Sequence, residues 1–189
     1  MSTSVEDLLR RVVDALATAE VPFMIAGSFA STVHGLPRTT QDLDLVIDPP
    51  DRAAVDRLLS ALDPLAYYAD VDAAHDAFLR RSMFNVIDHA SGWKVDLIIR
   101  KNRAFSREEF ARRVPMKLLE VDVFVASAED TIVAKLEWSK LGGRSERQLR
   151  DVAGIVATLG PALDLVYVAT WVNALHLEAE WSAAKALPT

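Results

Sequence analysis

The chain has 189 residues, a hydrophobic fraction of 51% and a mean hydropathy of +0.14, which together exclude an intrinsically disordered protein. Its formal net charge of −6 and pI near 5.2 give no global sign of nucleic-acid binding. Cysteine is absent, which excludes disulfides, thiol catalysis and cysteine–zinc sites. No apolar run reaches the roughly 18 residues of a membrane span, and the polar N-terminus does not resemble a secretory signal. We therefore expect a cytosolic protein with no membrane contact.

The first quarter of the chain predicts a helix, a strand, a short helix and a second strand. Apolar residues at helical spacing indicate the first helix, and a short apolar run after Pro22 indicates the first strand. Gly35 and Pro37 end the short helix, and Asp48-Pro49-Pro50 ends the second strand. The four elements cover residues 5–19, 23–26, 28–34 and 42–47.

The middle of the chain adds further helices and strands. Asp51 is a suitable N-cap for one helix, and Ser106 for another that carries acidic residues in its first turn and arginines in its last. Ala90-Ser91-Gly92 separates two apolar runs and predicts a hairpin. The expected strands cover residues 65–69, 83–89, 94–99 and 121–125, and residues 72–80 form a polar helix or loop.

The last third of the chain has a helical pattern. We expect three helices, with a break at Gly142-Gly143, and we expect the tryptophans at positions 138, 171 and 181 to lie in their core. These helices cover residues 127–140, 145–158 and 161–185. The whole pattern predicts an α/β (α+β) fold: a domain over 1–126 with a mixed sheet flanked by helices, followed by a C-terminal helical part over 127–189.

The most informative segment combines a Gly-Ser turn with a strand that carries two carboxylates. Asp42 and Asp44 alternate with Leu43 on the strand, so their side chains point to the same face. Carboxylates this close repel each other unless a cation lies between them, and oxygen donors favour Mg²⁺ or Mn²⁺. Gly27 allows the backbone to approach a ligand closely, and the helix after it presents free N–H groups to a phosphate. The pattern predicts triphosphate chemistry.

A third carboxylate would complete the metal site. Asp96 interrupts an apolar strand, where an unpaired charge would cost several kcal/mol. Asp88 in the preceding strand is the alternative. Three acids allow a two-metal mechanism in which an acceptor hydroxyl attacks the α-phosphorus and pyrophosphate leaves. Asp96 could also take the hydroxyl proton, while Ser28 would donate to the departing phosphates.

These motifs resemble a known family. Residues 25–47 are similar to the signature of the polymerase-β-type nucleotidyltransferase superfamily, and their form Gly-Ser…His-Gly-x-Pro-Arg-x-Thr-x-Asp-x-Asp resembles its AbiEii/MenT-like branch, which includes bacterial toxins. The resemblance implies a mixed sheet with flanking helices, Mg²⁺ dependence and nucleotidyl transfer. It also implies that Asp42, Asp44 and Asp96 hold the metals.

The resemblance continues more weakly into the helical third. Residues 128–136 are similar to the family's helix with a phosphate-contacting lysine, which here is Lys135. Residues 147–152 resemble its Arg-Asp element, in which Asp151 would order the site or that lysine. The family often has a second aspartate three residues further on, where this chain has Gly154.

Other charged residues could serve substrates. Arg38, in the loop before the carboxylate strand, could contact a phosphate or pair with an acid, whereas His34 is expected to pack at a helix end. A basic strip between residues 100 and 117 could hold a polyanion or could be a solvated surface with ion pairs. The strip consists of Arg100, Lys101, Arg103, Arg107, Arg112, Arg113 and Lys117.

The sequence leaves three functions open. In the first, the nucleoside triphosphate substrate donates its nucleotidyl group to RNA, including tRNA, in a toxin-type enzyme that could have a cognate antitoxin. In the second, the acceptor is a small hydroxylated antibiotic such as an aminoglycoside or lincosamide, which the acidic balance of the chain suits. In the third, the protein is a non-catalytic nucleotide-binding or partner-binding module.

Overall fold

The computed structural model describes residues 4–37, 39–143 and 145–188, which form two compact units. The first unit comprises residues 1–26 and 40–125, and the second comprises residues 27–39 and 126–189. The boundary at residue 125 lies next to the expected one at 126. Residues 27–39 were expected in the first domain but group with the C-terminal helices.

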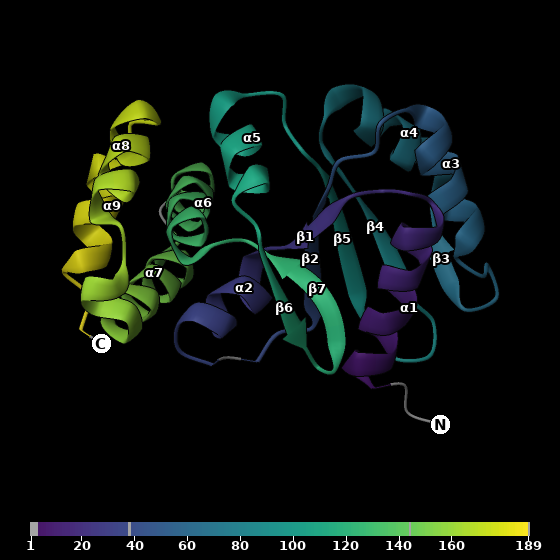
Figure 1. Cartoon of the computed structure of the whole chain (residues 1–189), viewed down its shortest axis with the longest axis horizontal. Coiled ribbons are helices and arrows are strands. Elements are labelled where there is room, and N and C mark those ends of the chain that lie inside the picture. Colours follow the sequence, from purple (N-terminus) through teal and green to yellow (C-terminus); the bar gives the residue numbers. More distant parts are fainter. Residues whose placement is uncertain (1–3, 38, 144, 189) are drawn as a thin grey trace. The chain divides into compact units, whose positions relative to one another are not determined.

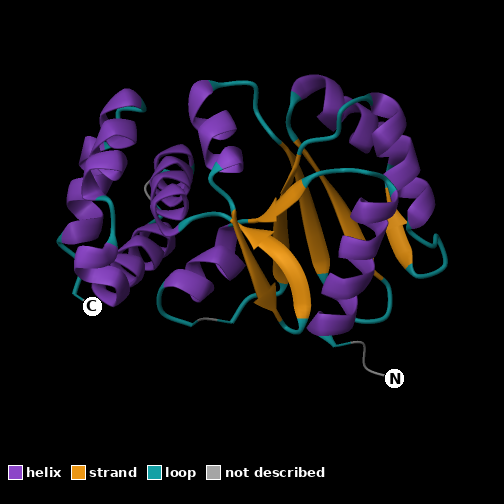
Figure 2. Cartoon of the chain, in the orientation of Figure 1, coloured by secondary structure: helices purple, strands orange, loops and turns teal. Residues whose placement is uncertain are grey.

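A mixed sheet forms the centre of the first unit (Figure 2). In the described residues it has seven strands in the order β3-β4-β5-β2-β1-β7-β6. The pair β2–β5 is parallel, as is β1–β7, and the remaining neighbours are antiparallel. This sheet confirms the predicted α/β fold class. The strands are β1 (Phe23–Ile25), β2 (Asp42–Ile47), β3 (Tyr67–Ala69), β4 (Met83–Asp88), β5 (Lys94–Ile99), β6 (Val114–Leu118) and β7 (Val121–Val125).

Three helices cover one face of this sheet: α1 (Val5–Thr18), α3 (Arg52–Ala61) and α4 (Val71–Arg80) (Figure 1). Leu43, Leu45 and Ile47 alternate along β2 and are fully buried on this side. Because side chains alternate between the two faces of a strand, the residues between them point the other way. We call the two sides of the sheet the covered face and the carboxylate face.

Local sequence signals explain the ends of the covering helices. Ser4 and Asp7 form a reciprocal capping box at the start of α1. Asp51 caps α3 as predicted, through a bond of 2.8 Å from the backbone N–H of Ala54 to its Oδ1. Arg81 ends α4 in the left-handed conformation, with φ of 51°. The first two caps use a side-chain oxygen to satisfy a helix N–H that has no partner within the helix.

Two features between β5 and β7 differ from the expectation. Helix α5 spans Ala104–Ala111, so it begins before Ser106, which is buried inside the helix and accepts a bond of 3.0 Å from Arg103 Nε. Strand β6 was not predicted. It contains Pro115, which an edge strand tolerates because half of its backbone N–H groups face away from the sheet.

The second unit is helical in the described residues. Its helices are α2 (Gly27–His34), α6 (Ala128–Leu141), α7 (Glu146–Leu159), α8 (Leu165–Ala174) and α9 (Glu178–Lys185), with a 3₁₀ turn at Gly160–Ala162. Helix α6 packs against α2, α7, α8 and α9. The expected helix over 161–185 is two helices, because His176 takes a left-handed φ of 56° between them. Trp138 was expected in the core, but 49% of it is exposed. Within the described residues, no helix has both the length and the hydrophobicity of a membrane span.

Candidate functional site

The carboxylate face brings three predicted residues together. In the parallel pairing of β2 with β5, Asp44 lies opposite Asp96, and Asp42 lies opposite Lys94. Asp42 and Asp44 are two residues apart, as are Lys94 and Asp96, so all four side chains project from the same face. Asp42 is exposed, Asp44 is half-buried and Asp96 is buried. The structure therefore places the three expected carboxylates on neighbouring strands of one sheet.

Lys94 lies between two of these carboxylates and was not identified from the sequence. Its Nζ is 2.9 Å from Asp96 Oδ2 and 3.7 Å from Asp42 Oδ1. The hydrogen bond to Asp96 raises the pKa of Lys94 above its ordinary value, and the charges of Asp96, Asp42 and Asp44 add to this rise, whereas burial opposes it. Lys94 therefore carries its positive charge at neutral pH.

Asn85 holds the other oxygen of Asp96. It lies opposite Asp96 in the antiparallel pairing of β4 with β5, and its Nδ2 donates a hydrogen bond to Asp96 Oδ1. The carboxylate of Asp96 is thus held in a fixed orientation by one neutral donor and one charged donor. A polar residue between the apolar Phe84 and Val86 would have placed Asn85 on the exposed side of its strand.

Asp88, the alternative third acid, lies on the covered face. In β4 it has the same parity as the buried residues Phe84 and Val86, and only 1% of it is exposed. Its Oδ2 accepts a 2.9 Å bond from the backbone N–H of Ser91 and another from the Ser91 hydroxyl. Its Oδ1 accepts a bond of 3.3 Å from Arg11. Asp88 therefore organises the β4–β5 turn and does not face the other carboxylates.

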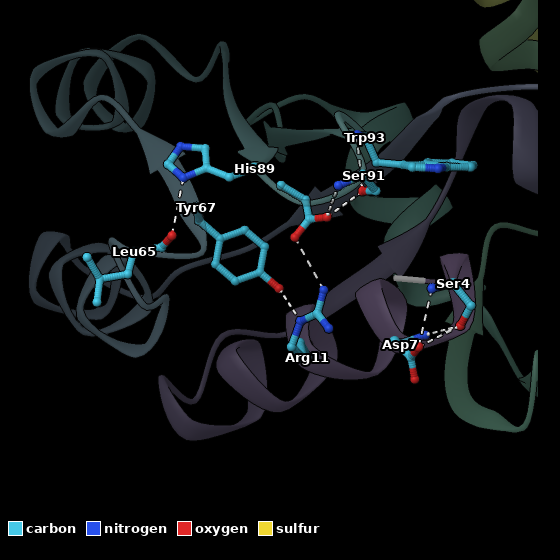
Figure 3. Close-up of polar contacts among 9 residues, drawn as sticks. Ser4, Asp7, Arg11, Leu65, Tyr67, His89, Ser91 and Trp93 are labelled. Atoms are coloured by element: carbon cyan, nitrogen blue, oxygen red, sulfur yellow. Dashed lines mark hydrogen bonds and ion pairs between the residues drawn. The ribbon is translucent and has the colours of Figure 1, made fainter. Parts of the chain in front are cut away.

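Arg11 connects this turn to β3 (Figure 3). Its Nε donates a bond of 2.5 Å to the hydroxyl of Tyr67, and its guanidinium lies over the Tyr67 ring, 5.7 Å from the centroid. The hydrogen bond from Arg11 to Tyr67 is the main cause of the raised pKa of Arg11. Arg11, Tyr67, Asp88 and Ser91 form what we call the hairpin clamp.

The Gly-Ser turn begins directly after β1. Ala26 is the residue after which the chain passes from the first unit to the second. It donates its N–H to the carbonyl of Asp44 at 2.9 Å. Gly27 follows in the chain with a φ of 57°, a conformation that favours glycine, and opens helix α2 in the second unit. Ser28 is the next residue and is buried. The turn thus has the conformation expected for it.

In the second unit, Lys135 of α6 and Asp151 of α7 form a buried ion pair. Lys135 Nζ donates to Asp151 Oδ2 at 2.7 Å, and only 5% and 9% of the two side chains are exposed. Ser31 of α2 also contacts Asp151, at 3.4 Å from its Oγ to Oδ2. The structure therefore joins the two residues as the sequence resemblance implied. Arg38 lies outside the described residues.

A close helix contact explains the glycine at position 154. A Cβ at Gly154 would lie 3.3 Å from the side chain of Leu36, and a Cβ at Gly35 would lie 2.9 Å from the backbone nitrogen of Ile155. The backbone of α7 therefore leaves no room for a side chain at Gly35, whereas a side chain at Gly154 would require Leu36 to shift slightly. His34, at the end of α2, bonds through Nε2 to the carbonyl of Ala126 at 2.7 Å.

The donor set of the carboxylate face fits a divalent cation in its chemistry. It offers oxygen atoms from two neighbouring strands, and these hard ligands are the ones that Mg²⁺ and Mn²⁺ prefer. In the described part of the chain, no three His, Cys, Asp or Glu side chains are grouped closely enough to form a ready metal site. Lys94, between Asp42 and Asp96, supplies a positive charge at this position.

The basic strip is largely engaged within the first unit. Arg100 pairs with Asp48 at 2.8 Å, and Lys117 pairs with Asp122 at 3.4 Å. Arg113 lies over the rings of Phe110 and Phe124, at 4.4 and 4.8 Å from their centroids. These contacts are typical of a surface stabilised by ion pairs and cation–π interactions.

Comparisons with solved structures identify the fold. The antibiotic-resistance factor ANT(2'')-Ia, solved in complex with adenylyl-2''-tobramycin, has a TM-score of 0.58 at 14% identity, covering 90% of this chain and 98% of that one. The lincosamide antibiotic adenylyltransferase LnuA, solved with lincomycin, gives 0.54 at 11% identity, with 82% and 98% covered. An antigenic nucleotidyltransferase-like protein from Paracoccidioides brasiliensis gives 0.55 at 16% identity, with 96% and 93% covered. No family model and no curated protein matches the chain. The chain therefore has a nucleotidyltransferase fold.

Proposed function

We propose that this protein is a metal-dependent nucleotidyltransferase that moves a nucleoside monophosphate from a nucleoside triphosphate to a hydroxyl group of an acceptor. The pairing of Asp44 with Asp96 in parallel strands, with Asp42 on the same face, is the observation that carries the proposal. On this fold, three carboxylates so placed provide the ligands and the base that the reaction needs.

The reaction balances with the residues of the carboxylate face. The acceptor oxygen forms a bond to the α-phosphorus, the bond from the α-phosphorus to the bridging oxygen breaks, and pyrophosphate leaves. Asp96, oriented by Asn85 and Lys94, accepts the proton of the hydroxyl. Asp42 and Asp44 would hold Mg²⁺ or Mn²⁺. When bound, this cation neutralises phosphate charge and lowers the pKa of the acceptor hydroxyl.

We assign the triphosphate to residues of the second unit. Gly27 and Ser28 offer the N–H groups of a helix start and a hydroxyl, which suit phosphate oxygens. Lys135 offers an ammonium whose position is fixed by Asp151. Arg38 completes the set in the sequence motif. These assignments rest on the family resemblance and on the contacts within this unit.

For the acceptor, we favour a small hydroxylated molecule with positive charge, as aminoglycosides are. Two structural neighbours were solved with an adenylylated aminoglycoside and with a lincosamide. The three carboxylates near Lys94 suit a cationic acceptor, and several cations of the strip at residues 100–117 already have partners. RNA as the acceptor, with the toxin role and antitoxin of the AbiEii/MenT-like branch, is the second candidate, since the strip is still the most basic part of the first unit.

Labelling distinguishes these functions. The protein is incubated with each α-³²P-labelled nucleoside triphosphate and Mg²⁺, together with an aminoglycoside panel, a lincosamide panel or total RNA. We expect label on a small molecule with the wild-type protein and none with Asp44→Asn. Label on RNA would assign the RNA acceptor in its place. Nucleotide binding without release of pyrophosphate from the triphosphate, whichever acceptor is present, would favour the non-catalytic module.

A further inference from the structure

Lys94 is built into the carboxylate face by the pairing of the strands. It lies opposite Asp42 on β2 and two residues before Asp96 on β5, so the sheet itself sets its position between the two acids. Its side chain is 39% exposed, and its Nζ reaches Asp96 at 2.9 Å and Asp42 at 3.7 Å. A surface lysine that only solubilises the protein would not need this position.

The contacts of Asp96 differ from those of Asp42. Both oxygens of Asp96 accept hydrogen bonds from this chain, one from Asn85 and one from Lys94. The side chain of Asp42 is 54% exposed, and its Oδ1 lies further from Lys94 Nζ, at 3.7 Å. Asp42 can therefore turn toward a ligand with little loss, whereas Asp96 is held by two donors. The exposed part of the carboxylate face is the part at Asp42.

A divalent cation on Asp96 would lie close to the ammonium. Mg²⁺ bound to Asp96 Oδ2 at about 2.1 Å would lie at most about 5 Å from Lys94 Nζ, because that nitrogen is itself 2.9 Å from Oδ2. Two positive charges at that separation repel strongly in a partly buried site. Lys94 and a metal ion on Asp96 therefore exclude each other unless the lysine moves away.

We propose that Lys94 takes the place of the second cation, so that this site binds one divalent metal ion, at Asp42 and Asp44, instead of two. The inference rests on the proposed function, since it concerns the cation of the same reaction. It changes the expected two-metal arrangement. Lys94 neutralises Asp96, whose oxygens can each accept a second hydrogen bond and so can still accept one from the acceptor hydroxyl. The metal ion faces the phosphates from Asp42 and Asp44.

Counting bound Mn²⁺ tests this directly. The full-length protein is titrated with Mn²⁺ alone at constant ionic strength, and free Mn²⁺ is measured by electron paramagnetic resonance. We expect one ion in the wild-type protein and two in Lys94→Gln, which keeps a hydrogen-bond donor and removes the charge. The first ion should bind about tenfold more tightly in this variant, because a neighbouring positive charge is gone.

Three further variants control the experiment. Lys94→Arg keeps the charge and should keep one ion. Lys94→Met removes charge and donor, and provides a second test if Lys94→Gln folds poorly. Lys117→Met removes a lysine that pairs with Asp122 elsewhere in the first unit and should behave as the wild-type protein does. Thermal melting without metal should show lower stability for the two uncharged Lys94 variants, with the loss reversed by Mn²⁺.

The outcomes separate this inference from the proposed function. Two ions in the wild-type protein, or an unchanged number in both uncharged Lys94 variants, would overturn the inference and leave a metal-dependent enzyme. An absence of Mn²⁺ binding in every variant would overturn the inference, and the Mg²⁺ dependence of the labelling reaction then decides the proposed function separately. One ion in the wild-type protein and two in the uncharged variants would support both.

Discussion

The two faces of the sheet in the first unit carry carboxylates under opposite conditions. On the covered face, the hairpin clamp gives Asp88 one guanidinium and the two donors of Ser91, all from this chain. On the carboxylate face, Lys94 is within the electrostatic influence of Asp42, Asp44 and Asp96. Asp88 thus has one nearby guanidinium, whereas Lys94 is shared by several carboxylates. The same residue type therefore has a structural role where its donors come from a turn and a neighbouring helix, and a different setting where one lysine contacts two carboxylates on paired strands.

The largest expected effect is on activity, at the carboxylate face. Asp44→Asn should lower kcat/KM for nucleotidyl transfer by about 10³-fold or more, because a neutral amide binds a divalent cation poorly. The free energy of unfolding should change by less than about 1 kcal/mol, since a repulsion between carboxylates is also removed. Pyrophosphate release and urea unfolding measure the two quantities.

The matched control for this variant is Asp122→Asn. Asp122 is exposed and pairs with Lys117, away from β2 and β5. It should leave both activity and stability nearly unchanged. Equal activity of Asp44→Asn and the wild-type protein would show that the carboxylate face has no part in the reaction.

On the covered face, we expect a substitution to lower stability and to leave activity unchanged. Asp88→Ala should lower the free energy of unfolding by about 2–3 kcal/mol, because it removes the acceptor of two Ser91 donors and leaves Arg11 without its carboxylate. This expected loss is smaller than the loss for breaking a fully buried ion pair, because the side chain of Arg11 is 42% exposed. Urea denaturation gives the loss, and activity below the unfolding transition should be preserved.

The third prediction concerns the other partner in the hairpin clamp. Tyr67→Phe removes the hydroxyl that accepts from Arg11 and keeps the ring beneath the guanidinium. We expect a loss of about 1 kcal/mol in unfolding free energy. Tyr68→Phe, on the same strand but with 54% of the residue exposed, is the control and should cost nothing measurable. A loss as large with Tyr68→Phe would mean that the hydrogen bond to Arg11 is not the cause.

The smallest prediction follows from a carboxylate of α1 that is fully exposed. Hydrogen bonds from Ser4 lower the pKa of Asp7 below its ordinary value of 3.8. A lowered pKa in the folded state stabilises the protein above the unfolded pKa, and the benefit is lost as pH falls through the folded pKa. The Tm difference between the wild-type protein and Asp7→Ala should therefore be present at pH 6 and shrink below pH 4. A Tm difference that stayed the same from pH 6 to below pH 4 would contradict this cause.

The sequence predicted the carboxylate strands well because their pattern is local. Alternation alone places Asp42 and Asp44 on one side of β2, and the same rule applies to Lys94 and Asp96 on β5. What the rule could not provide is the register between the two strands, which depends on pairing over fifty residues apart. For that reason Asp96 was a candidate beside Asp88, and Lys94 and Asn85 were not recognised.

Other differences have similar physical origins. Strand β6 was not predicted because Pro115 interrupts its strand-like sequence pattern. A proline is acceptable there because β6 lies at the edge of the sheet. The break at His176 requires a left-handed residue that is not glycine, for which sequence gives no strong signal. Residues 27–39 group with the C-terminal helices through contacts distant in sequence, such as that of Gly35 with Ile155.

The direct pairing of Asp44 with Asp96 also makes correct assembly and chemistry inseparable. If β5 slipped by one residue against β2, every side chain on it would exchange sides: Asp96 would enter the apolar interior, and Val95 and Leu97 would face outward. Such a misfolded chain would be both unstable and inactive. Only molecules in which β2 and β5 are paired in the correct register would be active. Turnover per molecule therefore measures the fraction of molecules with that register.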